Sequence, residues 1–323
     1  MRRKIFKFIR NLVGYSAKFP EEIQIEITNR CNLSCKMCIR DTLNIPLEDM
    51  PFETFEEIMK RLSLKSPLIK LLILTGLGEP LMHPRLAEMI ALANKLLPNT
   101  MIQFTSNGFL LGDKNRISLA KLKVEKITIS IELLPWSNTS TLDSHPPDQR
   151  VIENISSLSK SLKDTHIYLQ TVMQRDGLKG LEEIIKFGSQ IKAKAVNLVR
   201  KDTSYDPQLV RPSQENEKIL IKQAKKLGRK YGIQVYCIND QHLLMRIAAH
   251  FDRVCLRTDN YIYIDVDGNV TPCCNLRNLI GGNILKEDLS IIWHGEKMQQ
   301  FRKNQTKICV NCDTLKYKQR SNK

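Results

Sequence analysis

Three cysteines in one short segment are the residues of this sequence whose types and spacing first indicate chemistry. Cys31, Cys35 and Cys38 follow the spacing C-x3-C-x2-C, and neither a histidine nor a fourth cysteine stands nearby. Zinc usually takes four ligands and often takes cysteines as two C-x2-C pairs. Three thiolates can instead hold three irons of a cubane [4Fe–4S] cluster and leave the fourth iron open as a reaction site. We therefore expect a three-cysteine iron–sulfur site here.

Most of the other cysteines lie near the C-terminal end. The chain has nine cysteines in all, an odd number that fits a disulfide framework poorly. Cys255 with Cys273, and Cys309 with Cys312, make two separated pairs. Such pairs suit either a closed zinc site or a fully ligated [4Fe–4S] cluster, and spacing alone does not choose between these metals. Cys274 is an alternative ligand to Cys273.

The sequence shows neither a membrane span nor a secretory signal. No apolar run approaches the roughly 18 residues of a span, and Lys7 and Arg10 interrupt the apolar residues of the basic start. We expect a cytoplasmic protein. In a reducing compartment, clustered cysteines bind metal or do redox chemistry more often than they form disulfides. The hydrophobic fraction of 42% is enough for a buried core.

The formal net charge is +16, from 50 Lys and Arg against 34 Asp and Glu. Part of it lies at the ends, where we expect a basic helix over residues 1–20 and a basic tail over residues 316–323. This charge could attract an anionic partner, but basic runs alone are weak evidence, and we favour solvated basic ends on a charged surface. An alternative interpretation is a zinc-stabilised basic scaffold that binds RNA or another polyanion, but it leaves the three-cysteine segment unexplained. Residues 1–15 could form an amphipathic helix on a membrane; we expect them to pack on the core.

Strands and helices alternate about six times before residue 240, and this framework has to position the cysteines. Apolar runs and alternation predict strands at 22–28, 69–76, 101–108, 126–133, 166–173, 194–200 and 233–237. Helical spacing predicts helices at 51–62, 84–97, 117–123, 151–163, 180–192 and 213–232. The alternation predicts an α/β fold with a parallel sheet and right-handed crossovers, either open or closed into a barrel.

The alternation ends near residue 240. Residues 261–271 predict a β-hairpin with its turn at 267–269. We expect a domain boundary near 240–250, with a larger domain over 21–240 and a small cysteine-rich domain over 241–315. Cys237, at the end of the last strand of the alternation, is interpreted as a small buried hydrophobe.

The three-cysteine segment, placed after the first strand of a β/α series, resembles the signature of the radical SAM superfamily. Met37 stands where that family often has an aromatic residue. Similar motifs follow the second, third and fourth strands: TGLGEP (75–80), TSNG (105–108) and ISIE (129–132). Glu132 replaces the usual aspartate. The resemblance covers roughly residues 22–200 and implies a partial (β/α)6 TIM-type barrel with its site at the C-terminal ends of the strands.

The resemblance implies an enzyme that binds S-adenosylmethionine on the open iron. One electron from the reduced cluster would cleave its S–C5′ bond, and the 5′-deoxyadenosyl radical would abstract a hydrogen atom from the substrate. Glu79 and the backbone at Gly76 and Gly78 would face the amino group, with the glycines letting backbone approach the ligand. Asn107 and Ser130 would face the ribose and carboxylate. No residue is singled out as catalytic.

The C-terminal cysteines resemble the SPASM/twitch extension of radical SAM enzymes. The spacing C-x12-G-x4-C, the segment 280–296 and the final C-x2-C all match it. The cysteine number is closer to the short form, as in an aminocyclitol-oxidising dehydrogenase. The resemblance implies one auxiliary [4Fe–4S] cluster for electron transfer. Its ligands would be Cys255, Cys273, Cys309 and Cys312. The Gly-x4 spacing favours Cys273 over Cys274.

Two substrate classes stay open: a small sugar-like or aminocyclitol-like molecule, and a residue of a peptide or protein. Only 30 residues precede Cys31, which counts against a separate leader-binding domain there. We expect an electron donor such as flavodoxin or ferredoxin, and neither nucleic acid nor a membrane as partner. Arg200, at the end of the sixth strand, could reach a bound anion. His83 and Trp293 are interpreted as structural residues.

Overall fold

The computed structural model describes most of the chain. The described residues are 19–132, 148–173, 180–201, 211–237, 255–309 and Cys312. The expected basic N-terminal helix, apart from its last two positions, and the expected basic tail lie outside these residues. None of the helices in the described part has the length and apolar character that crossing a bilayer requires.

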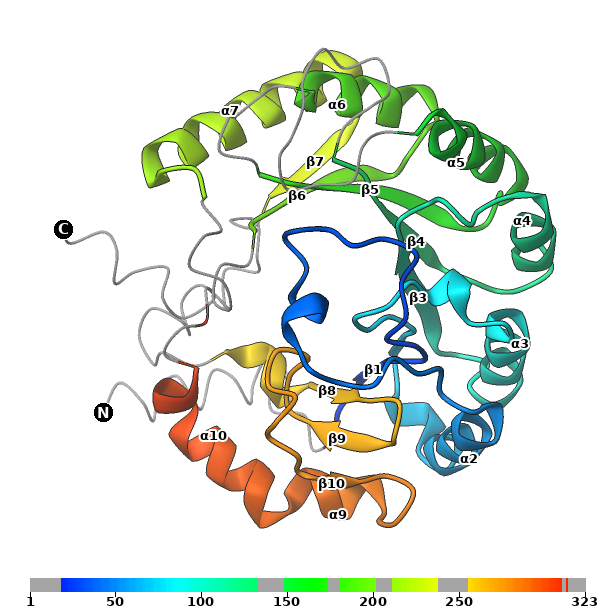
Figure 1. The fold of residues 1–323 in the computed structure, drawn as a ribbon, viewed down its shortest axis with the longest axis vertical. Helices are drawn as coiled ribbons and strands as arrows, with labels where there is room; N and C mark the ends of the chain where they lie inside the picture. The colour runs from blue at the N-terminus through cyan, green and yellow to red at the C-terminus, as the bar shows by residue number, and fades with distance from the viewer. Residues whose placement is uncertain are drawn as a thin grey trace.

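Seven parallel strands form the central sheet. Each pairs with the next strand along the chain, which is the arrangement that repeated β-α-β crossovers produce. They are β1 (Glu22–Ile25), β2 (Leu71–Ile73), β3 (Met101–Ser106), β4 (Lys126–Ser130), β5 (His166–Val172), β6 (Ala195–Val199) and β7 (Gln234–Cys237). The sheet curves into an open arc (Figure 1), which confirms the predicted α/β partial barrel.

Helices cover the outer side of this arc (Figure 1). They are α2 (Phe52–Ser63), α3 (Leu86–Leu96), α4 (Asp113–Leu119), α5 (Gln149–Ser161), α6 (Leu181–Gln190) and α7 (Gln214–Tyr231). Their apolar faces pack on alternate strand residues. Phe55 and Ile58 of α2, for example, share one buried core with Ile23 and Ile25 of β1. Burial of these apolar side chains is the main force that holds helices on the sheet.

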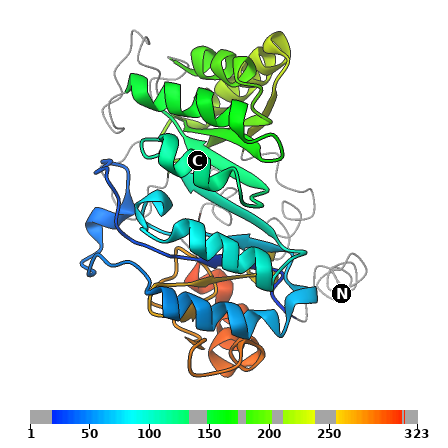
Figure 2. The ribbon, with the colours of Figure 1, turned by 90° about the vertical axis from the view of Figure 1, so that its right-hand side faces the viewer.

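The C-terminal segment extends the same sheet beyond β1. β8 (Tyr261–Ile264) pairs in parallel with β1, and β9 (Asn269–Thr271) and β10 (Gly282–Asn283) add antiparallel strands. Gly268 has a φ of 80° in the turn between β8 and β9, a conformation that glycine adopts without strain. The predicted hairpin is confirmed. Figure 2 shows the C-terminal elements (orange and red) beside α2 (blue), at one end of the arc.

Several elements differ from the sequence-based expectation, among them α4, β2 and α10 (Glu296–Ile308). α4 begins at Asp113, earlier than predicted, because a carboxylate in the first turn is favourable at the N-terminal end of a helix. β2 ends at Ile73, earlier than predicted, because the chain then turns into the 75–80 segment. The helix α10 (Glu296–Ile308) follows α9 (Leu289–His294) and was not predicted.

The inner face of the arc is polar. Successive strand side chains point to opposite faces, and residues such as Ile129 and Leu169 belong to the core under the helices. The residues that follow them therefore face inward. Ser130, Gln170 and Asn197 are register neighbours across β4, β5 and β6. Bulky branched side chains usually fill the interior of a TIM barrel, whereas this interior offers hydroxyl and amide groups.

Candidate active site

The three-cysteine segment forms a loop that continues from β1 inside the arc (Figure 1). Cys31, Cys35 and Cys38 form no disulfide and are half-buried. The Cys38 N–H donates to the Cys35 carbonyl at 2.9 Å, and the short helix η1 (Ile39–Thr42) follows. Burial raises the pKa of the Cys38 thiol. A bound metal inverts this effect, because its positive charge stabilises the thiolate.

Arg40 fixes this loop from within. Its side chain is buried, and its Nη2 donates to the Leu33 carbonyl at 2.8 Å. The guanidinium also pairs with Asp41 at 2.8 Å. Its positive charge acts on Cys38 and is in turn influenced by Cys31 and Cys38. Nothing in the sequence pattern singles out this arginine, because its role depends on how the loop closes.

The 75–80 segment packs tightly against the chain that leads into the cysteine loop. A Cβ added at Gly76 would lie 2.3 Å from Cγ of Glu26, and one at Gly78 would lie 2.4 Å from the Arg30 carbonyl oxygen. Cβ atoms essentially never approach other atoms closer than 3.0 Å. Both positions therefore require glycine for internal packing. Their predicted contact with S-adenosylmethionine stays a prediction.

Glu79 joins the loops that follow β1, β2 and β3. Its Oε2 accepts the Asn107 N–H at 2.7 Å, and its Oε1 accepts the Leu81 N–H at 3.1 Å. Its own N–H donates to the Arg30 carbonyl at 2.8 Å. The side chain is only 3% exposed, and this burial raises its pKa to about 7 against the opposing effect of the hydrogen bonds. Such a carboxyl group is suited to receive an amino group.

Asn107 completes this convergence at the end of β3. Its Nδ2 donates to the Asn32 Oδ1 at 2.9 Å and lies 3.8 Å from the Cys31 Sγ. The cysteine loop, Glu79 and the TSNG segment therefore meet at one edge of the sheet. Ser130 lies farther along that edge, where β4 ends.

Three of the four predicted auxiliary cysteines come together at the end of α10. The charges of Cys312 and Cys255 act on the Cys309 thiol, whose pKa is raised to about 12, mainly by burial. Gln305 links them: its side chain accepts the Cys255 N–H at 3.0 Å, and its carbonyl accepts the Cys309 N–H at 2.8 Å. Gln305 therefore positions two cysteines that lie far apart in the sequence, and no sequence pattern pointed to it.

The fourth auxiliary position involves two adjacent thiols. A hydrogen bond between them lowers the pKa of Cys274 to about 6 and raises that of Cys273. The positive charge of Arg257 acts on both. Cys274 also packs against Tyr261 in a small cluster with residues of β2 and β8. The assignment of Cys273 rather than Cys274 as the ligand stays a prediction.

The other residues singled out in the sequence have structural partners. The Arg200 guanidinium binds the Glu217 carboxylate at 2.9 Å in a buried pair, so the structure gives it this role rather than that of reaching an anion. His83 is buried, with its Nε2 3.0 Å from a backbone carbonyl oxygen. Trp293 and Cys237 are buried in the apolar core, as predicted.

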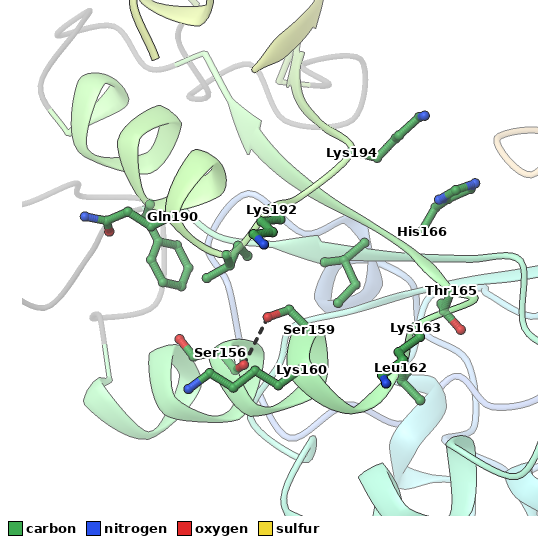
Figure 3. Close-up of a pocket in the computed structure, with 13 residues that line it drawn as sticks. Ser156, Ser159, Lys160, Leu162, Lys163, Thr165, His166, Gln190, Lys192 and Lys194 are labelled. Carbon is green, nitrogen blue, oxygen red and sulfur yellow. Dashed lines mark hydrogen bonds between the residues drawn. The ribbon is translucent and has the colours of Figure 1, made fainter. Parts of the chain in front are cut away.

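A basic groove of about 690 Å³ lies between α5 and α6 (Figure 3). Its lining includes Lys160, Lys163, Lys192, Lys194 and His166. His166 begins β5 and Lys194 directly precedes β6, so the groove lies at the amino ends of the strands. Sites of barrels of this kind lie at the carboxyl ends. The groove is therefore separate from the cofactor site.

The donor set fits iron–sulfur clusters better than a single metal ion. Within the described ranges, no group of three His, Cys, Asp or Glu side chains is placed to hold one ion. A cubane cluster is larger and is held by cysteine thiolates spread around it. All the predicted ligands are cysteines that form no disulfide, and cysteine thiolates are the ligand chemistry of such clusters.

Comparisons with known sequences agree with this geometry. The radical SAM superfamily matches residues 25–188, and the SPASM iron–sulfur cluster-binding domain matches residues 255–313. The tungsten-containing aldehyde ferredoxin oxidoreductase cofactor-modifying protein of Pyrococcus furiosus is 25% identical over 304 residues, which cover 87% of this chain and 82% of that protein. A GTP 3′,8-cyclase of Clostridium perfringens is 32% identical over 121 residues, covering 36% of this chain and 37% of the cyclase.

Solved structures share the fold. SuiB of Streptococcus suis, bound to precursor peptide SuiA, has a TM-score of 0.74 at 16% identity, covering 97% of this chain and 74% of SuiB. Native anSMEcpe with bound AdoMet has a TM-score of 0.67 at 16% identity, covering 87% of this chain and 82% of that protein. With residues 25–188 matched by the superfamily and residues 255–313 by SPASM, the chain belongs to the radical SAM superfamily and is an iron–sulfur enzyme that uses S-adenosylmethionine.

Proposed function

We propose that this enzyme abstracts a hydrogen atom from a residue of a peptide or protein substrate. The observation that carries the radical chemistry is the convergence of three loops, with the Asn107 amide 3.8 Å from the Cys31 thiol and the Glu79 carboxylate on the Asn107 N–H. We also propose a barrel domain over 21–240 and a cluster domain over 241–315.

Cys31, Cys35 and Cys38 hold the cluster that binds S-adenosylmethionine in this proposal. When reduced and loaded, this centre supplies a 5′-deoxyadenosyl radical that takes a hydrogen atom from the substrate. Glu79 receives the amino group of S-adenosylmethionine, and Asn107 turns its amide toward the ribose and carboxylate. The remaining contacts come from Ser130 and the backbone at Gly76 and Gly78.

Four C-terminal cysteines hold the auxiliary cluster in this proposal. The ligands are Cys255, Cys273, Cys309 and Cys312. A closed, fully ligated cluster suits electron transfer. Gln305 holds the backbone of Cys255 and Cys309 in place through two hydrogen bonds. A one-electron donor such as flavodoxin or ferredoxin supplies the reducing electron from outside.

The polar inner face supports a substrate that forms many hydrogen bonds. Ser130, Gln170 and Asn197 are half-buried neighbours on three adjacent strands, so their hydroxyl and amide groups can bind the main chain of a peptide. The fold of SuiB, whose structure contains a precursor peptide, covers nearly the whole chain with a TM-score of 0.74. The anSMEcpe structure also exists with a bound peptide, at a TM-score of 0.66.

A small aminocyclitol-like molecule is the second candidate substrate. The number of auxiliary cysteines favours it, and BtrN, whose structure contains AdoMet and 2-DOIA, has a TM-score of 0.50 over 88% of this chain. Because that likeness is weaker than the likeness to SuiB, we place the peptide first.

The cofactor assignment is tested by metal analysis and by S-adenosylmethionine cleavage. The wild-type chain, reconstituted without oxygen, is expected to hold about eight irons with matching sulfide, as two cubane clusters require. With dithionite it is expected to form 5′-deoxyadenosine. Cys35→Ala should abolish this product and Cys309→Ala should not. One zinc and about four irons would contradict the auxiliary cluster, and zinc alone would contradict the radical chemistry and favour the basic scaffold.

The substrate assignment is tested by the same product. A pool of random hexapeptides and a panel of aminocyclitols are added separately to the reduced enzyme with S-adenosylmethionine. Faster formation of 5′-deoxyadenosine with the peptide pool, together with peptides that have lost hydrogen by mass spectrometry, supports the peptide. Acceleration by an aminocyclitol alone would replace the peptide with the second candidate.

A further inference from the structure

Glu26 is a completely buried carboxylate next to both cofactor-binding regions. It directly follows β1, on the strand that leads into the cysteine loop, and its exposure is 0%. Its Oε2 accepts the Leu77 N–H of the glycine segment at 2.7 Å. Gly76 leaves the space that the Glu26 side chain fills, since a Cβ there would lie 2.3 Å from Cγ. The glycine segment is therefore shaped around this one side chain.

The partners of Glu26 on its other side come from the C-terminal domain. Arg277 donates through Nη2 to Oε1 at 2.5 Å and through Nη1 to Oε2 at 3.1 Å. The Tyr263 hydroxyl on β8 donates to Oε2 at 2.6 Å and also contacts Arg277. Buried carboxylates need such compensation, because an uncompensated buried charge is strongly unfavourable. Two-point contact between a guanidinium and a carboxylate also fixes their relative orientation.

Arg277 belongs to the same short turn as the auxiliary cysteines. The Leu276 N–H donates to the Cys273 carbonyl at 2.9 Å, so the residue before Arg277 is tied to the cysteine pair. A continuous series of contacts therefore runs from Cys273 through Arg277 and Glu26 to Leu77. Glu79 lies two residues after Leu77, and its carboxylate holds Asn107 beside Cys31.

We infer that Arg277 is a positioning residue for S-adenosylmethionine, through which the auxiliary-cluster turn fixes the glycine segment of the cofactor site. This rests on the proposed function, because it takes Cys31, Cys35 and Cys38 as the S-adenosylmethionine centre. Arg277 acts through Glu26, to which its guanidinium donates two hydrogen bonds. The folding of the turn that carries Arg277 in the C-terminal domain is thereby coupled to the binding of S-adenosylmethionine in the barrel.

The test measures binding rather than turnover. The wild-type chain, Arg277→Gln and the double variant Glu26→Gln with Arg277→Gln are reconstituted without oxygen, and iron and sulfide are counted. The dissociation constant for S-adenosylmethionine is measured by calorimetry, and the change that the ligand causes in the spin-resonance spectrum of the reduced cluster is recorded. Arg302→Gln is the matched control, because this half-buried arginine of α10 donates locally to the Trp293 carbonyl.

We expect Arg277→Gln to keep its iron and to bind S-adenosylmethionine at least tenfold more weakly, while Arg302→Gln binds like the wild type. The double variant removes the unpaired buried carboxylate and should still bind weakly, because the link is missing. Recovery of wild-type affinity in the double variant would overturn the inference, since Arg277 would then only neutralise charge.

Three other results separate the inference from the proposed function. Wild-type affinity in Arg277→Gln would overturn the inference and leave the proposed function intact. Loss of iron from Arg277→Gln would also overturn it, because the residue would then act on cluster retention. Failure of the wild-type chain to bind S-adenosylmethionine would overturn the proposed function, and the inference with it.

Discussion

Gly78→Ala tests how tightly the cofactor site is built. A Cβ at this position would lie 2.4 Å from the Arg30 carbonyl oxygen, 2.6 Å from the Thr28 carbonyl oxygen and 2.8 Å from the Arg30 nitrogen. All three are backbone atoms, so no side chain can rotate away. The Glu79 N–H, next in the chain, donates to that same Arg30 carbonyl, and Arg30 directly precedes Cys31. The added methyl group therefore pushes the glycine segment away from the cysteine loop.

The size of the shift follows from these distances. The contact at 2.4 Å has to open to between 3.0 and 3.4 Å, a displacement of about 0.6–1.0 Å. Overpacking of this kind typically costs about 1–3 kcal/mol of stability. A misplacement of about 1 Å at a reacting site can lower a rate by about a hundredfold. We therefore expect Gly78→Ala to fold and to form 5′-deoxyadenosine about a hundredfold more slowly.

The assay compares Gly78→Ala with Gly112→Ala after anaerobic reconstitution. Gly112 precedes α4 with a φ of −64°, and a Cβ there meets nothing within 4 Å, so its substitution should leave the rate unchanged. Iron content, thermal midpoint and the rate of 5′-deoxyadenosine formation are measured for each. A rate for Gly78→Ala within about twofold of the wild type, at equal iron content, would refute the steric account of this glycine.

Two further changes probe other parts of the site. Gln305→Ala leaves the Cys255 N–H without its acceptor and removes the donor to the Thr258 hydroxyl, which typically costs about 1–3 kcal/mol. Iron should fall from about eight to about four per chain, whereas the exposed Gln300→Ala should keep its iron. Equal iron in both variants would contradict this. Burial raises the pKa of Glu79 from its ordinary value of 4.5 to about 7, so the contribution of this carboxyl group to stability is present below pH 4.5 and is lost as pH rises through 7. The loss of stability is about 3 kcal/mol. Urea unfolding of the cluster-free chain should show this pH dependence in the wild type and not in Glu79→Gln. Parallel pH profiles of the two proteins would contradict the role given to Glu79.

Most strands of the barrel could be predicted because they alternate between a core face and an inner face, and β2 could be predicted because it lies in a continuous apolar run. Residues such as Ile127 and Ile129 are buried under the helices, and this pattern is visible in the sequence. The extension of the sheet could not be predicted in the same way. β8 pairs with β1 through Glu22 and Tyr261, which lie far apart in the chain. Local periodicity carries no information about such a pairing.

The cysteines of the site could be predicted because their spacing is itself the chemical signal. The residues that hold the loops together could not. Arg40, Glu26, Arg277 and Gln305 are common residue types without a distinctive local pattern, and each acts through a partner that folding brings close. A buried carboxylate such as Glu26 is recognisable only when its burial and its partners are known.

Backbone contacts explain which departures from the family pattern this site tolerates. The loops after β1 and β2 meet through the Arg30 carbonyl and the Glu79 N–H, so their spacing depends on Gly78 as well as on the Glu26 side chain. Glu132, longer than the usual aspartate, accepts the Val172 N–H at 2.9 Å and so caps the end of β5. Gly78 and Glu79 have no such freedom, because backbone atoms enclose Gly78 and the Glu79 carboxyl accepts two backbone N–H groups.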